Sequence, residues 1–305
     1  MPEILAIALN PTVDVSCETE TVRPTLKTRT RNQRHDPGGG GINVARVIEE
    51  LGGAVDVVYL SGGATGALLD DCMERTSVRA HKVPIGQPTR VAYMVHENHT
   101  GFEYRFIPEG PQVDPAELKN VLTHVERFEG DYVVASGSLP RGVSHDCYAR
   151  MAEITGRKNK RFILDSSGRA LEEALSTKSV FLVKPSIGEL QSLVGEKLDE
   201  AGAQNAALDI VKTGRARYVA VSMGMEGAFL ASEKGILRLP AKHVRIRSAV
   251  GAGDSFVGGM VFSLARGNEV EHAFRLGMAA GTAAVMTSGT QLCRRKDVEA
   301  LFTPG

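Results

Sequence analysis

The residues best placed for chemistry lie at positions 250–256, which read Val-Gly-Ala-Gly-Asp-Ser-Phe. The glycines precede a predicted helix, whose first backbone N–H groups have no partner within the helix and can bind an anion. Asp254 falls in the same first turn, where the helix dipole favours its ionised form. An anion cradle beside a carboxylate suits phosphoryl transfer, in which Asp254 would accept the proton of an attacking hydroxyl. An ordinary helix cap with glycine in its turn is the alternative.

A second glycine-rich segment, Pro-Gly-Gly-Gly-Gly-Ile-Asn-Val-Ala at positions 37–45, also opens a predicted helix. Four glycines permit a ligand to approach the backbone closely, although a flexible turn explains them as well. A Rossmann dinucleotide loop fits poorly, because Asn43 stands where its third glycine would be and the next predicted strand ends without an acid. The sequence has no G-x-x-x-x-G-K-[ST] motif, which excludes a P-loop.

Three further polar positions have both a chemical and a plain structural interpretation. Asp14 follows the first predicted strand and could hold sugar hydroxyls, or it could be a solvated turn residue. In Lys-Pro-Ser-Ile-Gly-Glu at 184–189, the lysine could position a nucleotide and the glutamate could hold metal-bound water. Ser186 and Glu189 fit a helix capping box equally well. His96 and His99 are three residues apart in a predicted hairpin, which favours a solvated turn over a metal site.

Apolar runs and helix-period segments alternate along the chain and predict the elements that position these residues. Short buried strands are expected at 4–9, 55–60, 132–135, 162–164, 180–183 and 218–221, and helices at 42–51, 116–125, 171–175, 206–211, 256–264 and 273–286. Continuously apolar strands separated by helices predict a parallel sheet that is covered on both faces. Several strands end in Gly, Ser, Asp or Asn, and ligands of such sheets bind at these carboxyl ends.

Two stretches, at about 13–35 and 88–107, interrupt this alternation. The second alternates polar and apolar residues around Asn-His-Thr-Gly at 98–101, which is typical of an antiparallel hairpin with a glycine turn. We expect both stretches to form a small β-sheet lid on a single domain that spans residues 1–305.

The composition excludes several other classes of protein. Lysine and arginine (36) balance aspartate and glutamate (36), so neither a nucleic-acid partner nor a disordered acidic chain is expected. No apolar run approaches the roughly 18 residues that a membrane helix needs, and no signal peptide is evident, so no membrane partner is expected. Four scattered cysteines without a C-x-x-C pair favour a reducing compartment, so a cytoplasmic location is predicted.

Eight motifs then follow one another along the chain, at 37–46, 62–66, 104–106, 136–140, 165–168, 183–185, 250–255 and 289–293. Their order and spacing resemble the PfkB branch of the ribokinase-like carbohydrate kinases over essentially the whole length. The resemblance implies a three-layer α/β/α fold with a mainly parallel central sheet and a small β-sheet lid.

The resemblance also implies an activity, the transfer of a phosphoryl group from ATP, with Mg²⁺, to the 1-hydroxyl of fructose 6-phosphate. The product would be fructose 1,6-bisphosphate, within glycolysis. Kinases of fructose 1-phosphate or tagatose 6-phosphate are the close alternatives. From other classes, a non-catalytic sugar-phosphate regulator and a nicotinamide dehydrogenase remain. The intact Gly-Ala-Gly-Asp argues against the regulator, and the missing ribose acid weakens the dehydrogenase.

The roles of individual residues are carried over from the family at matching positions. Asp254 corresponds to the catalytic base, and the anion hole comprises Gly251, Ala252 and Gly253. The sugar phosphate would be held by Asp14, Gly39, Gly40, Gly41, Asn43, Arg90 and Ser138. ATP would be bound by Lys184, Ser186, Glu189, Ser222, Gly224 and Gly227, although the family usually has Asn at the place of Ser186.

Two further sites are implied by the resemblance. The lid forms much of a homodimer interface in this family, so Arg29, toward the sugar phosphate, and Lys27, toward ATP, are expected to reach the neighbouring subunit's site. Potassium loops would map to Ser248, Val250, Ala284, Thr287, Gly289 and Gln291.

Overall fold

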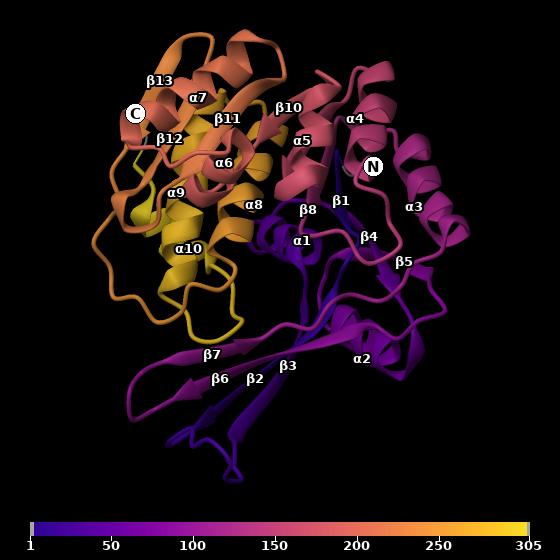
Figure 1. The fold of residues 1–305 in the computed structure, drawn as a ribbon, viewed down its shortest axis with the longest axis vertical. Helices are drawn as coiled ribbons and strands as arrows, with labels where there is room; N and C mark the ends of the chain where they lie inside the picture. Colours follow the sequence, from indigo (N-terminus) through magenta and orange to yellow (C-terminus); the bar gives the residue numbers. More distant parts are fainter. Residues whose placement is uncertain (1–2, 304–305) are drawn as a thin grey trace.

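A central β-sheet runs through the molecule and carries helices on both faces (Figure 1). The computed structural model describes residues 3–303, and within them the sheet has nine strands in the order β13-β12-β11-β10-β9-β8-β1-β4-β5. The bounds are β1 Ile4–Ala8, β4 Asp56–Ser61, β5 Arg79–Pro84, β8 Tyr132–Ser136, β9 Arg161–Asp165, β10 Val180–Val183, β11 Ala216–Ser222, β12 Ala228–Ser232 and β13 Gly235–Leu239. In this sheet the neighbouring strands β11, β10, β9, β8, β1, β4 and β5 are parallel to one another. β12 and β13 add an antiparallel edge beside β11.

Helices cover the two faces in two groups. They are α1 Gly40–Glu50, α2 Gly63–Glu74, α3 Pro115–Arg127, α4 Cys147–Arg157, α5 Gly168–Ser176, α6 Ile187–Val194, α7 Glu200–Lys212, α8 Ala252–Ala265, α9 Val270–Val285 and α10 Arg295–Leu301. Alternate residues of β1 face opposite cores: Leu5 and Ile7 pack with α3 to α7, and Ile4 and Ala6 pack with α1, α2, α8 and α9. Two apolar faces on one strand therefore produce the three layers.

A smaller sheet forms the lid, which projects from one end of the central sheet (Figure 1). Its strands are β2 Thr12–Thr19, β3 Arg31–Gly38, β6 Arg90–Glu97 and β7 Glu103–Phe106, in the order β3-β2-β6-β7. β6 and β7 form the hairpin that the alternating pattern predicts, and Gly101 in its turn has a left-handed φ of 74°. His99 lies in this turn and His96 lies within β6, so both histidines belong to the predicted hairpin.

All six predicted strands and all six predicted helices are present, so the three-layer fold with its lid is confirmed. The sequence interpretation did not include the helices α2, α4, α6 and α10, the strand β5 or the β12–β13 hairpin. β5 escapes the apolar-run criterion because it is a mostly exposed edge strand rich in charged residues. Among the described residues, no helix is long and apolar enough to span a membrane.

Glycine packing between α8 and α9 gives the first prediction. A Cβ at Gly259 would lie 2.9 Å from Ala280 Cβ and 3.0 Å from the Leu276 carbonyl oxygen, neither of which can rotate away. We expect Gly259→Ala to lower the free energy of unfolding by about 1–3 kcal/mol, because overpacking forces backbone to move. Gly188→Ala is the control, since its Cβ would meet nothing within 4 Å. It should leave stability unchanged or raise it by about 0.4–1 kcal/mol in urea denaturation. Equal stabilities for the two variants would contradict the packing.

Candidate active site

Asp254 lies in the first turn of α8, where three segments of the chain converge. Asn43 Nδ2, from α1, donates a hydrogen bond of 2.9 Å to Asp254 Oδ2. Ser136 Oγ, from the end of β8, donates one of 3.2 Å to Asp254 Oδ1. The carboxylate therefore has a fixed direction. Burial raises the pKa of Asp254, and the hydrogen bond from Asn43 and the charge of Lys184 oppose that rise. A basic, oriented carboxylate is suited to accept a proton from a hydroxyl.

The helix terminus beside Asp254 has the form of an anion site. Gly251 precedes α8 with a left-handed φ of 70°, and a Cβ there would lie 2.5 Å from Leu292 Cδ2. Gly251 therefore serves both a tight turn and close packing. The N–H groups of the first helical turn, which includes Ala252 and Gly253, have no acceptor within the helix and can stabilise negative charge.

The glycine segment at 39–41 allows α1 to pack directly onto the strand ends. Gly39 has a φ of 99°, and a Cβ there would lie 2.8 Å from Pro11 Cα. A Cβ at Gly40 would collide with Ser136 Oγ, and one at Gly41 with the Ile7 carbonyl oxygen. These glycines are packed against backbone, so close approach explains them better than a flexible turn. Their packing brings Asn43 to Asp254.

Asp14 and Arg90 lie on neighbouring strands of the lid, close to the main sheet. The carboxylate of Asp14 packs against Gly38, where a Cβ would collide with it. Burial raises the pKa of Asp14 to about 7, against the lowering charges of Arg46 and Arg90. Arg90 Nη2 donates to the Asn10 carbonyl at 2.7 Å, and Nη1 donates to the Pro108 carbonyl at 3.2 Å. The guanidinium of Arg90, which is expected to hold the sugar phosphate, is therefore anchored by two carbonyl groups. Its remaining N–H groups are left for a ligand.

Lys184 lies beside the first turn of α8, close to Gly253 and Asp165. Its Nζ lies 3.1 Å from Asp165 Oδ1, and a Cβ at Gly253 would lie 3.7 Å from that nitrogen. Burial lowers the pKa of Lys184, but the charges of Asp165 and Glu189 outweigh it, so the pKa is raised overall. Burial raises the pKa of Asp165 to about 6 against the charge of Lys184. A buried ammonium thus lies beside the anion-binding turn.

The segment after Lys184 contains the capping box that the sequence offered as an alternative. Ser186 N donates to Glu189 Oε2 at 2.7 Å, and Glu189 N donates to Ser186 Oγ at 3.3 Å. Ser222 N donates to the Pro185 carbonyl at 3.1 Å, which places the β11 end beside this cap. Gly224, with a φ of 58°, and Gly227, with a φ of 105°, shape the short turn that follows.

Two expected residues do not reach Asp254 within one chain. Lys27 and Arg29 are exposed in the connection between β2 and β3, at the end of the lid farthest from the central sheet (Figure 1). Any contribution from them to an active site would have to come from a second copy of the chain.

The expected potassium positions gather in two adjacent loops. Thr287 Oγ1 lies 2.7 Å from the Ala284 carbonyl oxygen and 2.6 Å from that of Gln291. Ser248 N donates to the Val285 carbonyl at 3.4 Å, which joins the two loops. In the second loop Gly289 has a left-handed φ of 62°, and in the first Val250 N donates to Ser248 Oγ. The segments therefore form a cluster rich in carbonyl oxygens.

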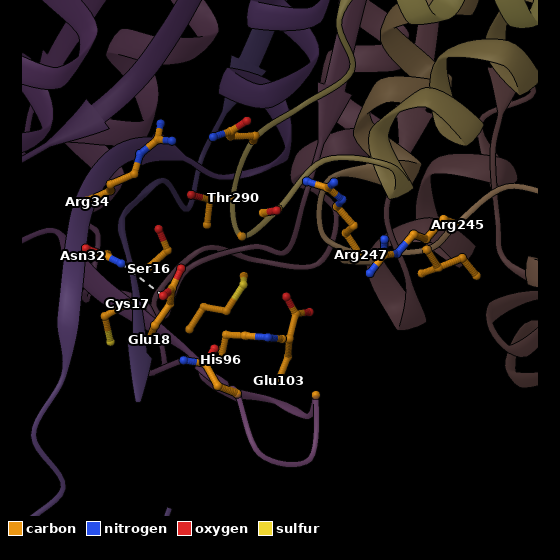
Figure 2. A pocket seen from close by; sticks show the side chains of 17 residues that line it. Ser16, Cys17, Glu18, Asn32, Arg34, His96, Glu103, Arg245, Arg247 and Thr290 are labelled. Atoms are coloured by element: carbon orange, nitrogen blue, oxygen red, sulfur yellow. Dashed lines mark hydrogen bonds between the residues drawn. The ribbon is translucent and has the colours of Figure 1, made fainter. Parts of the chain in front are cut away.

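A cavity of about 560 Å³ separates the lid from these loops. Figure 2 shows Glu18, His96 and Glu103 entering it from the lid, and Arg247 and Thr290 from the opposite side. The lid is tied to the loops on both sides of this cavity. Ser248 Oγ donates to Glu103 Oε2 at 3.1 Å, and Thr290 Oγ1 donates to Asp36 Oδ2 at 2.6 Å. Asp254 is not among the residues that line it.

Three residues of the site received no role from the sequence. Ser136 and Asp165 belong to quoted motifs at the carboxyl ends of β8 and β9, a position that could have identified them. Arg46 ends another motif, and its Nη1 donates to the Pro37 carbonyl at 2.8 Å.

Comparison with known proteins agrees with this geometry. ATP-dependent 6-phosphofructokinase isozyme 2 of Mycobacterium tuberculosis is 40% identical over 304 residues, which cover 99% of this chain and 89% of that protein. The isozyme 2 of Escherichia coli is 36% identical, covering 99% and 98%. A 1-phosphofructokinase of Bacillus subtilis is 30% identical over 286 residues, 93% of each protein.

Solved structures agree as well. Phosphofructokinase-2 from Escherichia coli in complex with fructose-6-phosphate superimposes with a TM-score of 0.93 at 34% identity. The same protein in complex with potassium gives 0.95 at 35%, and both comparisons cover 99% of this chain and 98% of that one. Fold and site together define a phosphotransferase of the ribokinase-like class. Residues 2–297 match the model of the pfkB family carbohydrate kinases, and the chain belongs to that family.

The raised pKa of Asp14 gives the second prediction. The folded chain keeps this proton up to about pH 7, whereas an ordinary aspartate loses it near 3.8. The folded state therefore binds more protons between these pH values, and its stability falls as pH rises through them. Asp14→Asn removes this loss. The free energy of unfolding of the variant, minus that of the wild type, should therefore be about 1–2 kcal/mol larger at pH 8 than at pH 5. Urea denaturation at both pH values checks this, and a pH-independent difference would contradict it.

Proposed function

We propose that this kinase is an ATP-dependent 6-phosphofructokinase, which phosphorylates the 1-hydroxyl of fructose 6-phosphate to give fructose 1,6-bisphosphate. One observation supports the chemistry above all. The carboxylate of Asp254 is held by Asn43 and Ser136 in the turn that offers free N–H groups to an anion. The full-length relatives named as 6-phosphofructokinases support the choice of substrate. Glycolysis in the cytoplasm is the proposed setting, in keeping with four free cysteines.

In the proposed reaction, the sugar phosphate lies between the lid and the strand ends. Its contacts would be Asp14, Gly39, Gly40, Gly41, Asn43, Arg90 and Ser138. Asp254 takes the proton of the 1-hydroxyl, whose oxygen bonds to the γ-phosphorus as the bond to the β,γ-bridging oxygen breaks and ADP leaves. The N–H groups of residues 251–253 would stabilise charge on the transferring group.

The nucleotide would lie on the opposite side of the anion-binding turn. Lys184 is buried there with its charge preserved by Asp165, and it can attract the ATP phosphates. Ser186, Ser222, Gly224 and Gly227 would contact the nucleotide. Mg²⁺ takes few protein carboxylates besides phosphates and water, and Asp165 and Glu189 fit that donor set. When bound, Mg²⁺ would neutralise charge on the β- and γ-phosphates.

Potassium activation is a second part of the proposal. The carbonyl groups around Thr287 and the contacts of Ser248 support a monovalent cation between the two loops. The loop of Ser248 leads directly into the anion-binding turn at Gly251, so a cation there would steady the catalytic segment.

We also propose a homodimer through the lid, with Lys27 and Arg29 completing the partner's site. Tyr93 and Phe106 face each other across β6 and β7 and are 48% and 58% exposed. Leu26, at the tip that carries Lys27 and Arg29, is 62% exposed. Large apolar residues gathered on one exposed surface are typical of an interface, and a second copy would bring Lys27 and Arg29 to a site that they do not reach within one chain.

The third prediction concerns the substrate. Initial rates with Mg-ATP should be highest for fructose 6-phosphate and lower for fructose 1-phosphate, tagatose 6-phosphate and unphosphorylated sugars. A preference for fructose 1-phosphate or tagatose 6-phosphate would transfer the function to those alternatives. Binding without turnover of any sugar would favour a non-catalytic regulator.

The same assay tests the potassium proposal, since replacing Na⁺ by K⁺ should raise the rate. Equal rates in both salts would contradict the potassium proposal.

The fourth prediction concerns the dimer. Tyr93→Glu places a charge on the proposed interface and should convert the dimer to a monomer in analytical ultracentrifugation. The same variant should lose most of its activity, because Lys27 and Arg29 of a neighbour no longer reach the site. Val194→Glu, 43% exposed at the end of α6, is the control and should stay dimeric. A wild-type chain that is monomeric and fully active would contradict the proposal.

A further inference from the structure

We infer that Asn10 is a positioning residue for the sugar phosphate, an inference that rests on the proposed function. Asn10 follows β1 at the carboxyl edge of the central sheet, and only 7% of it is exposed. Because it is buried, we expect it to act through its neighbours and not by touching the substrate. It holds two residues that would contact the substrate, Ser138 through its side chain and Arg90 through its backbone.

The side-chain contact fixes the direction in which Ser138 can donate. Asn10 Nδ2 donates to Ser138 Oγ over 3.1 Å, so the hydroxyl oxygen is the acceptor in this pair. Ser138 is exposed while Asn10 is buried behind it. An amide NH₂ cannot accept, so the hydroxyl proton of Ser138 stays free to point toward the site. A phosphate oxygen there would receive it as a charge-assisted hydrogen bond.

The Asn10 amide is packed closely against Gly110, where a Cβ would lie 2.2 Å from Asn10 Oδ1 and 2.8 Å from Nδ2. A Cβ at Gly110 would collide with Asn10 Oδ1, so only glycine lets the chain pass so close to this oxygen. Gly110 is itself held, because Arg141 Nε donates to its carbonyl oxygen at 2.9 Å. The whole amide is thus confined against backbone, and its nitrogen donates to Ser138.

The backbone contact fixes Arg90. The Asn10 carbonyl accepts from Arg90 Nη2, and the Pro108 carbonyl on the connection from β7 accepts from Nη1. Among the described residues, Asn10 Oδ1 and Arg90 Nε are buried without a hydrogen-bond partner. Each such atom costs about 1–3 kcal/mol, so this arrangement is not the one that stability alone would favour. Two unpaired atoms beside one expected phosphate contact indicate a functional constraint.

The fifth prediction compares two substitutions. Asn10→Asp keeps the shape of the side chain but replaces the donor by an acceptor. The new carboxylate accepts the hydrogen bond of the Ser138 hydroxyl, which can then no longer donate to the phosphate, and it adds a negative charge. We expect the KM for fructose 6-phosphate to rise about 10- to 100-fold, as the loss of a hydrogen bond to a charged group implies. The KM for ATP and kcat should change by less than about threefold. Asn10→Ala leaves Ser138 free to donate and should raise the KM for fructose 6-phosphate less.

A double substitution separates positioning from a merely structural role. In a Ser138→Ala background, Asn10→Asp should raise the KM for fructose 6-phosphate by a smaller factor than in the wild-type chain, because only the effect of its added charge remains. Full additivity, or an Asn10→Asp variant with the wild-type KM, would overturn the inference. So would a parallel loss of kcat, ATP affinity and melting temperature in both single variants. If the wild type neither binds nor phosphorylates fructose 6-phosphate, the proposed function fails as well, and that outcome is seen before any variant is made.

Discussion

The hydrogen-bonded carboxylate of Asp254 is the constraint on which the rest of this structure depends. Its donors come from residues 211 and 118 positions away in the sequence, Asn43 and Ser136. Only a parallel sheet brings the end of β8 to the same edge as the starts of α1 and α8. The glycines at 39–41 then let α1 sit on the strand ends, because any side chain there would collide with backbone or with Ser136. The fold and the site therefore impose the same requirement on these glycines.

Charge in the site is arranged locally in a chain whose net charge is zero. Burial raises the pKa values of Asp14, Asp165 and Asp254, so this cleft is an unfavourable place for isolated carboxylates. Lys184 offsets the cost for Asp165, and hydrogen bonds offset it for Asp254. Such a site stabilises anionic substrates through a few cations and through backbone N–H groups, and glycine supplies the latter without adding a formal charge.

Much of the fold was predictable because its signals are local. Apolar runs on both faces predict central strands, and the β6–β7 hairpin follows from alternation around Gly101. The β12–β13 hairpin was not predicted, because its two-residue connection, Glu233-Lys234, lacks the usual Asn-Gly or Asp-Gly signal. Within the site, Asp254 and Asn43 stand out through glycine-rich motifs. Asn10, Ser136 and Asp165 acquire meaning only when distant strand ends meet. The reciprocal hydrogen bonds between Ser186 and Glu189 show the converse, a local cap that the sequence offered as one of two explanations and that the structure contains.

The most direct test of this account is Asp254→Asn, measured by single-turnover phosphoryl transfer together with calorimetric binding of fructose 6-phosphate and ATP. The amide keeps the shape of the carboxylate but cannot accept the hydroxyl proton. We predict a transfer rate about 10²- to 10⁴-fold below the wild type, with both ligands still bound at near wild-type affinity. A variant that retains more than about a tenth of the wild-type rate would contradict the role of Asp254 as the base.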